Sequence, residues 1–279
     1  MGILNVTPDS FSGDGLLIDL PSTNKISNGQ GLTLKNILRR AKMFIHDGAD
    51  ILDVGGESSR PGAKPVSEKE EIERVIPVIR LLSRKINRPV SVDTHKPAVA
   101  ELALKSGASI VNTIRGINPD TRLLKAVARH KAAIVLMHMR GNPATMQKKI
   151  HYHDLMKEIV RELTISIEKC LETGIKSDRI IIDPGIGFGK TVYHNLEILR
   201  RLDILKKLNQ PILVGTSRKS FIGNVLNQGD PARRIMGTAA TVSAAILNGA
   251  HIVRVHDVRE MYAVAKITDA ILNHQSYQK

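Results

Sequence analysis

Short apolar runs rich in β-branched residues recur along the chain, and an amphipathic stretch follows each of them. The runs are apolar throughout rather than at every second position, which is typical of parallel strands buried on both faces. The amphipathic stretches carry apolar residues three and four positions apart, as in Ile72, Val75 and Ile79, and this spacing indicates helices with one buried face. The expected strands cover 3–6, 50–54, 89–92, 109–112, 133–138, 179–183, 211–215 and 251–256. The expected helices cover 34–47, 67–86, 97–106, 120–131, 154–173, 195–208, 231–248 and 259–273.

Eight strand–helix units in alternation predict an α/β fold whose parallel sheet closes into a (β/α)8 barrel, a TIM barrel, because open doubly wound sheets usually have fewer units. The length of 279 residues is close to the roughly 250 typical of one such barrel. No linker divides the chain, so residues 1–279 are expected to form a single domain. Only residues 16–33, with Pro21 and several Asn and Gly residues, are irregular, and we expect a long loop there.

Composition narrows the class of protein. With four Phe, four Tyr and no Trp, the core is expected to be aliphatic. The lone Cys170 lies in a helical stretch and is expected to be a small core residue, and a single cysteine fits the reducing conditions of the cytoplasm. No apolar run approaches the roughly 20 residues that span a bilayer, so no membrane partner is expected. Because the chain starts directly in a strand-like run, we expect a preceding segment or fused domain in a longer protein.

The net charge of +14 suggests an anionic partner. The basic residues are spread along the chain, and solvated helix faces explain most of them. No aromatic residues alternate with them to stack on bases, so no nucleic-acid partner is expected. Attraction of a phosphorylated small molecule is the remaining role for the charge.

Nearly every expected strand ends on a polar residue. In barrels of this type the chemistry lies at the carboxyl ends of the strands. Any one such residue alone is explained equally well as a helix cap or a loop hydrogen bonder, but a nearly complete ring of them indicates an active site. The ring consists of Asn5, Asp53, Asp93, Asn112, His138, Asp183, Ser217, Arg218, Lys219, Arg254 and His256.

The ring divides by chemistry into two groups. Asp93, Asn112 and Asp183 offer carboxylate acceptors and an amide, which suit a flat heterocycle with an amino-pyrimidinone edge. The second group carries positive charge and suits a phosphate or pyrophosphate, and the loops after strands seven and eight are a frequent phosphate site in barrels. This second group consists of Arg254, His256 and Arg60.

Two other motifs are weaker. The loop 184–191 resembles a phosphate-binding Walker A loop, but Pro184 stands where that motif needs Gly, and its glycines are evenly spaced. His151 and His153 suggest a metal site, but no acidic or cysteine partner stands at suitable spacing.

Long segments of the chain resemble a known family. Residues 5–12 (NVTPDSFS) and 53–62 (DVGGESSRPG) are similar to the two signature segments of dihydropteroate synthases. Further matches lie at 91–94, 137–143, 183–191, 215–220 and 254–257, so the resemblance covers essentially the whole chain in order. The paired loop segments and Ser217-Arg218-Lys219 speak against another pterin-binding barrel, a methyltetrahydrofolate–corrinoid methyltransferase. Retention of the polar ring speaks against a non-catalytic or nucleic-acid-binding protein.

The resemblance implies a reaction of folate biosynthesis, in which p-aminobenzoate displaces pyrophosphate from 6-hydroxymethyl-7,8-dihydropterin pyrophosphate. It also implies Mg²⁺ on the pyrophosphate, contacted by Asn5, and a homodimer, with a fused folate-pathway domain in the longer protein. The implied pterin-binding residues are Asp93, Asn112, Asp183 and Lys219, and the implied pyrophosphate-binding residues are Arg254, His256 and Arg60. The implied aminobenzoate-binding residues are Ser59, Pro61, Phe188 and Ser220, where sulfonamides also bind in this family. The catalytic set is expected to be Lys219, Asp93, Asp183, Arg254 and His256, and the loops 7–12 and 58–62 are expected to close over it.

The resemblance implies that His138, although it belongs to the polar ring, has a structural role in its loop. The chain departs from the family pattern at three places. Ser59 replaces the usual Thr, and Thr113 replaces an Asp, which puts in doubt any bond that this Asp makes. The extended stretch 16–33 implies a different closure of the first loop.

Overall fold

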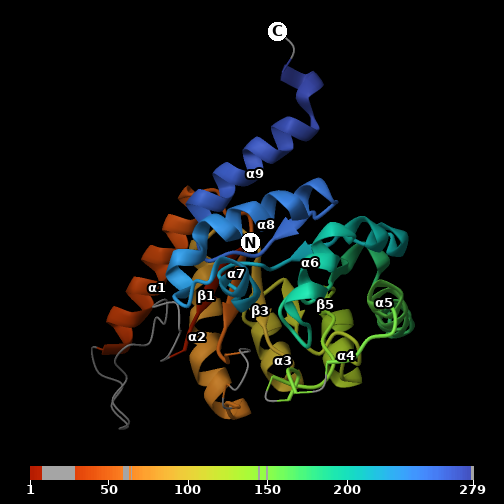
Figure 1. Cartoon of the computed structure of the whole chain (residues 1–279). Coiled ribbons are helices and arrows are strands. Elements are labelled where there is room, and N and C mark those ends of the chain that lie inside the picture. The colour runs from red at the N-terminus through yellow and green to blue at the C-terminus, as the bar shows by residue number, and fades with distance from the viewer. Residues whose placement is uncertain (8–28, 59–62, 64, 144, 149, 278–279) are drawn as a thin grey trace.

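The computed structural model describes residues 1–7, 29–58, 63, 65–143, 145–148 and 150–277. Its strands are β1 (Gly2–Asn5), β2 (Leu52–Gly55), β3 (Val90–Asp93), β4 (Ile110–Thr113), β5 (Ala133–Met137), β6 (Ile180–Asp183), β7 (Leu213–Val214) and β8 (Ile252–Val253). Its α-helices are α1 (Gly29–His46), α2 (Glu68–Lys85), α3 (Pro97–Lys105), α4 (Thr121–Arg129), α5 (Leu155–Glu172), α6 (Val192–Arg200), α7 (Ser220–Leu226), α8 (Ile235–Leu247) and α9 (Val258–Leu272). Strands and helices alternate along the chain, except that two helices, α7 and α8, follow β7 (Figure 1).

The strands form a closed parallel barrel. β1 to β6 pair in sequence order, and β7 pairs with β8. Two bridges, Ile182 with Ile212 and Gly2 with Val255, join the pair to the larger sheet on both sides. The prediction of a (β/α)8 barrel is therefore confirmed.

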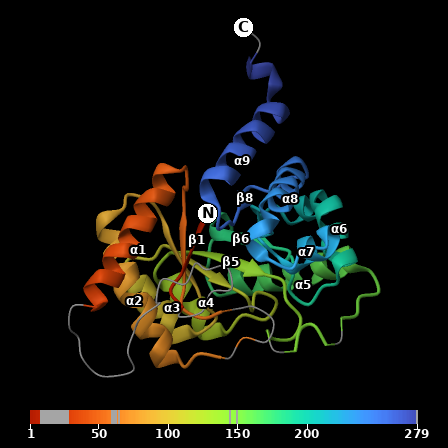
Figure 2. The same cartoon turned by 60° about the vertical axis from the view of Figure 1, so that its left-hand side comes forward.

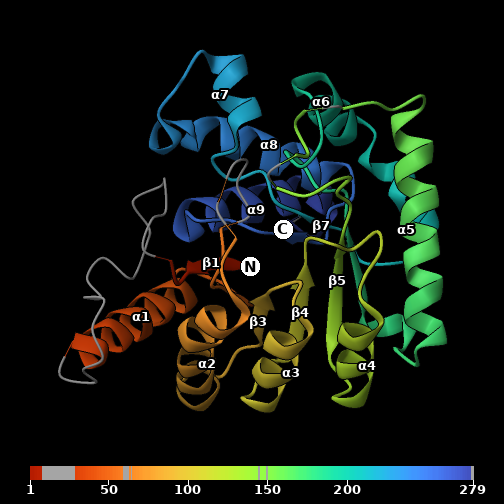
Figure 3. The same cartoon turned by 90° about the horizontal axis from the view of Figure 1, so that it is seen from below.

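The helices surround the strands as an outer ring (Figure 3). The main core, made of Ile, Leu, Val and Ala, lies between the ring and the barrel. Cys170 is buried in it, as predicted. A separate cluster of Ile110, Val135, Ile181 and Leu213 fills the barrel interior. No helix of the described part is long and apolar enough to cross a membrane.

Helix α9 extends beyond the body of the barrel toward the carboxyl end of the chain, as Figures 1 and 2 both show. Its first part packs against α8. A short 3-10 helix, His274–Tyr277, follows it.

Several helices differ from the prediction. The predicted helix 231–248 divides into a 3-10 helix, Pro231–Arg234, and α8. α1 begins at Gly29, inside the stretch expected to be a loop, because Ile37 and later residues anchor the helix in the core and outweigh the low helix propensity of its glycines. The predicted helix 195–208 divides into α6 and a 3-10 helix, Leu202–Leu208. α7 was not predicted, because it is only seven residues long and contains Gly223. The remaining residues 16–28 of the expected loop lie outside the described residues.

Candidate active site

The candidate active site is a layer of polar side chains directly above the apolar interior of the barrel. Because side chains of a strand alternate between its two faces, the residue two positions after an inward apolar residue also points inward. Ile110 and Ile181 belong to the interior cluster, and two positions later stand Asn112 and Asp183. Strand register aligns Asp93 with Asn112 across β3 and β4. The local sequence pattern thus brings polar side chains of different strands to one depth.

Arg254 bonds to Asp53 and Asp93, and Asp53 in turn bonds to Asn112. Its Nε donates to Asp53 Oδ2 over 2.6 Å, and a terminal nitrogen donates to Asp93 Oδ2 over 2.8 Å. Asn112 Nδ2 donates to the same Asp53 oxygen over 3.1 Å. Burial raises the pKa of Asp93 to about 7, and Arg254 opposes this rise. A carboxylate that is paired on one side and titrates near neutrality is suited to recognising the NH groups of a heterocycle.

Asp53 was predicted to lie in the polar ring but was assigned to neither the heterocycle nor the phosphate group. Its side chain is fully buried, and its Oδ1 atom has no hydrogen-bond partner. The sequence showed a polar residue in an apolar strand, but the partner Arg254 is 201 residues away along the chain. Asp53 therefore orients Arg254 from beneath.

Asp183, Lys219 and Phe188 form the other side of the site. Asp183 Oδ1 accepts from the N–H of Gly185 over 2.7 Å. The Lys219 ammonium donates to the Ile186 carbonyl and lies 4.5 Å from the centre of the Phe188 ring. Burial lowers the pKa of Lys219 to about 8 and raises the pKa of Asp183, and each charge counteracts the shift of the other. A cation, a carboxylate and an aromatic face thus meet at one place.

The turn before α7 holds Lys219. Arg218 has a left-handed φ of 58°, which is costly for a residue with a side chain. Its guanidinium compensates by binding Asp257, with 2.9 Å between Nε and Oδ2. His256 Nδ1 lies 2.9 Å from the Ser217 hydroxyl in the same turn. Ser220, the first residue of α7, is exposed at its start.

A cavity of about 240 Å³ opens beside Asp93, and its lining includes Glu57, His95, Ile114 and Arg115. Glu57 is held by Lys96, which lies 2.6 Å from it and 2.5 Å from Glu71. This cluster, which sequence reasoning missed, anchors the start of the loop after β2. Ser59, Arg60 and Pro61, and residues 8–12 of the first expected loop, lie outside the described residues.

Thr113 makes one bond that an Asp at this position would also make. Its hydroxyl accepts from the N–H of Arg115 over 3.3 Å, and the side chain is buried. The hydroxyl therefore holds the turn after β4 without adding a negative charge.

The amide oxygen of Asn5 lies beside Gly55, where an added Cβ would be 3.7 Å from it and 3.6 Å from Cβ of Asp93. The described residues contain no group of three His, Cys, Asp or Glu side chains placed to hold a metal ion. The rings of His151 and His153 meet edge to face, with 3.3 Å between their Nε2 atoms.

Comparison with known proteins gives a consistent answer. Residues 1–256 match the family model described as pterin binding enzyme. The dihydropteroate synthase of Synechocystis sp. is 46% identical over 97% of this chain and 89% of its own length. The dihydropteroate synthase of Bacillus subtilis is 46% identical over 98% of this chain and 88% of its own length. The crystal structure of the Yersinia pestis dihydropteroate synthase with a sulfonamide drug complex superimposes with a TM-score of 0.88, at 41% identity over 98% of this chain and 93% of that one.

The barrel fold, the polar side chains at the carboxyl ends of its strands (the barrel mouth) and the family match define a pterin-binding enzyme. Within that class, the identities over nearly the whole chain show that it belongs to the dihydropteroate synthase family, the transferases of folate biosynthesis. The folic acid synthesis protein fol1 of Schizosaccharomyces pombe is also similar, at 44% identity, and there the match covers only 36% of the relative. The family therefore includes longer proteins with further segments.

Proposed function

We propose that this barrel mouth condenses 6-hydroxymethyl-7,8-dihydropterin pyrophosphate with p-aminobenzoate to give 7,8-dihydropteroate and pyrophosphate. The observation that carries the proposal is the convergence of Asp93, Asn112 and Asp183 at one depth, with Arg254 joined to Asp93. A related structure from Clostridium difficile was determined in the presence of pteroic acid, and one from Thermus thermophilus is a complex with 4-aminobenzoate.

The pterin ring is assigned to the inner layer of the site. Asp93 and Asp183 accept hydrogen bonds from its NH groups, and Asn112 offers both a donor and an acceptor. Lys219 balances the charge of Asp183. Burial holds Asn112 and Asp183 in place before the pterin binds, so these two groups do not need to reorganise.

The pyrophosphate is assigned to Arg254, His256 and Arg60, as the family resemblance implies. In the described structure the Arg254 guanidinium is neutralised by Asp53 and Asp93. On binding, we expect the phosphate to replace Asp93 as a partner while Asp53 keeps the guanidinium in place. Asp93 is then free to accept from the pterin.

Asn5 is proposed to contact Mg²⁺. A single neutral oxygen at the edge of the site fits this ion, because Mg²⁺ often keeps its waters and binds through substrate phosphates with few protein ligands. The ion would neutralise charge on the leaving pyrophosphate.

The aminobenzoate is assigned to Phe188 and Ser220, together with Ser59 and Pro61. Its amine attacks the methylene carbon next to the pterin ring, the carbon–oxygen bond to pyrophosphate breaks, and the nitrogen then loses a proton to solvent. Because the ring nitrogens can stabilise positive charge on that carbon, bond breaking can precede attack, and no strong general base is needed. Closure of the site keeps water from the same carbon.

The test is pyrophosphate release by the pure folded chain with Mg²⁺. Release is expected only when both substrates are present, and chelation of Mg²⁺ is expected to abolish it reversibly. Absence of turnover under these conditions would refute the proposal.

We further propose that the chain is a homodimer. Support comes from large apolar side chains exposed on α8 and α9, among them Met236, Ile267 and Ile271, which are 77%, 66% and 62% exposed. Such a surface is expected to be covered by a partner. Light scattering after size exclusion should give twice the chain mass, and Ile267→Asp should give the monomer. A monomeric wild-type chain would refute the dimer.

Two predictions from the sequence stay predictions. The cytoplasmic location rests on the single buried cysteine and on the class of reaction. A fused folate-pathway domain is supported by the length of the fol1 relatives. Fractionation of cells and the full reading frame test them.

A further inference from the structure

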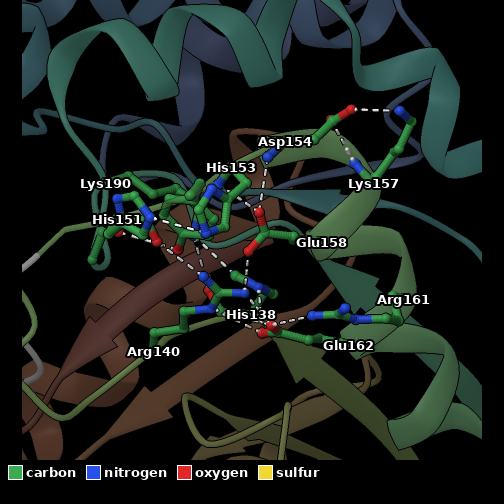
Figure 4. Close-up of polar contacts among 12 residues, drawn as sticks. His138, Arg140, His151, His153, Asp154, Lys157, Glu158, Arg161, Glu162 and Lys190 are labelled. Carbon is green, nitrogen blue, oxygen red and sulfur yellow. Dashed lines mark hydrogen bonds and ion pairs between the residues drawn. The ribbon is translucent and has the colours of Figure 1, made fainter.

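A network of polar side chains runs from the loop after β6 to the outer helix α5 (Figure 4). Its inner member, Lys190, is 3% exposed, and His138 at the end of β5 is fully buried. The Lys190 ammonium lies 3.0 Å from the Phe188 carbonyl, 3.2 Å from the His138 carbonyl and 3.1 Å from His138 Nδ1. The three N–H groups of the ammonium thus have three acceptors.

The contacts fix the protonation of His138. The Glu162 carboxylate, whose pKa is lowered to about 2, can only accept, so the proton of the neutral His138 ring must lie on Nε2. Nδ1 is therefore the acceptor for Lys190, whose own pKa is lowered by burial to about 7. Nε2 then donates to Glu162 Oε2, 3.1 Å away. Burial lowers the pKa of His138 to about 4, in agreement with a neutral ring.

The outer part of this network is anchored to α5. The Arg140 guanidinium binds Glu162 and lies 2.7 Å from Glu158. Glu158 accepts from the N–H groups of His153 and Asp154 over 2.7 and 2.8 Å, at the start of the helix. The network therefore ties the loop after β6 to a rigid element.

That loop needs external support. Gly185, Gly187 and Gly189 have left-handed φ values of 69°, 81° and 59°, and glycines impose little conformation of their own. A side chain instead binds the backbone of each residue from 185 to 189. Asp183 accepts from the N–H of Gly185, and Asn195 accepts from the N–H of Gly187. The carbonyls of Ile186, Phe188 and Gly189 accept from Lys219, Lys190 and Tyr152, in that order.

We propose that Lys190, with its amine oriented by His138 and Glu162, is a positioning residue that holds Phe188 against the p-aminobenzoate subsite. The inference rests on the proposed assignment of Phe188 to that subsite. Of the residues assigned to the pterin, Asp93 and Asn112 lie on strands β3 and β4, outside this network. Asp183 and Lys219 contact the same loop at Gly185 and Ile186, whereas Lys190 holds it at the Phe188 carbonyl. Loss of the network should therefore weaken binding of the aminobenzoate more than binding of the pterin pyrophosphate.

Two substitutions of His138 separate its two bonds. An Asn side chain places its amide near the position of Nδ1 and retains the acceptor for Lys190, whereas Gln places its amide near Nε2 and retains only the bond to Glu162. His138→Gln is expected to raise the KM for p-aminobenzoate about tenfold, as expected for loss of a hydrogen bond from a charged donor, and to leave the KM for the pterin pyrophosphate within about threefold. His138→Asn is expected to restore most of the aminobenzoate KM.

The chain offers a matched control. His130 Nε2 lies 3.2 Å from Glu101, which also binds Arg129, so the same chemistry occurs on the outer helices α3 and α4. His130→Gln should leave both KM values unchanged. Thermal melting shows whether each variant is folded, and if His138→Gln is not, Lys190→Met makes the same test.

The outcomes separate the two claims. Equal rises in the aminobenzoate KM for His138→Asn and His138→Gln, or equal rises in both KM values, would show a structural role only and overturn the inference. An unchanged aminobenzoate KM in His138→Gln would overturn it too. A wild-type chain without turnover would instead refute the proposed function, and the subsite with it.

Discussion

Asp53→Asn removes a negative charge from beneath the site with almost no change in side-chain shape. The bond from Arg254 Nε, 2.6 Å long in the wild type, then ends on a neutral amide oxygen and loses its ionic character, while Arg254 keeps its bond to Asp93 at 2.8 Å. A hydrogen bond between charged groups contributes about 1.5–3 kcal/mol. At about 2 kcal/mol of lost transition-state stabilisation, kcat/KM for the pterin pyrophosphate should fall about 30-fold.

The same substitution should also move the pH profile. Burial raises the pKa of Asp93 to about 7, Arg254 lowers it, and the charge of Asp53 raises it. The ionised carboxylate is the form that accepts from the pterin, so wild-type kcat/KM should fall as the pH drops below about 7. Without the charge of Asp53 the pKa of Asp93 falls, and the acid limb should move to lower pH.

The assay is pyrophosphate release at limiting pterin pyrophosphate, between about pH 5 and pH 9. Asp203→Asn, at an exposed carboxylate on the 3-10 helix after α6, is the matched control and should match the wild type. If Asp53→Asn keeps kcat/KM within about threefold and leaves the acid limb in place, Asp53 does not orient Arg254 and the reasoning is wrong.

Three further substitutions test other parts of the structure. Lys219→Ala, like Asp93→Ala, should reduce kcat/KM about 100-fold or more while the melting curve shows a folded protein; near-wild-type turnover would mean that the site is misplaced. Lys96→Met should lower the free energy of unfolding by about 3–5 kcal/mol, because it leaves a buried carboxylate without its cation; chemical denaturation measures this, and an unchanged midpoint would contradict it. Gly185→Ala should impair both turnover and melting temperature, because its Cβ would lie 2.0 Å from the His138 carbonyl, whereas Gly174→Ala has nothing within 4 Å of its Cβ and should affect stability alone. Equal effects of the two would show that the close approach at Gly185 is unimportant.

Local patterns predicted most of the fold. Strand existence follows from short apolar runs, and each run ends at a turn, so all eight strands were located within a few residues. Helix boundaries were less certain because they depend on packing. The core contacts of Ile37 hold a helix that extends back to Gly29, through glycines that locally favour a loop.

Most of the candidate site residues could be predicted, because the carboxyl ends of parallel barrel strands all lie at one end of the barrel. Asp93, Asn112, Asp183, Lys219, Arg254 and His256 all lie at the same mouth, although their roles stay predictions. What the sequence could not show are pairings across the barrel, such as Asp53 with Arg254, since closure depends on the whole topology. His138 was predicted to be structural, and only its contact with Lys190 shows what it supports.

The seam between β1 and the last strand has a consequence for how the enzyme is made. The N–H of Ile3 donates to the Val255 carbonyl and the N–H of Val255 to the Met1 carbonyl, both over 3.0 Å, so residues near the two ends must meet. A folding intermediate that stops at β6 presents two open sheet edges, which template association with other chains. In such an intermediate Arg254, which follows β8, is not yet in its place beside Asp53 and Asp93. Molecules trapped before the seam closes are therefore expected to be both inactive and prone to aggregation, and specific activity becomes a measure of completed folding.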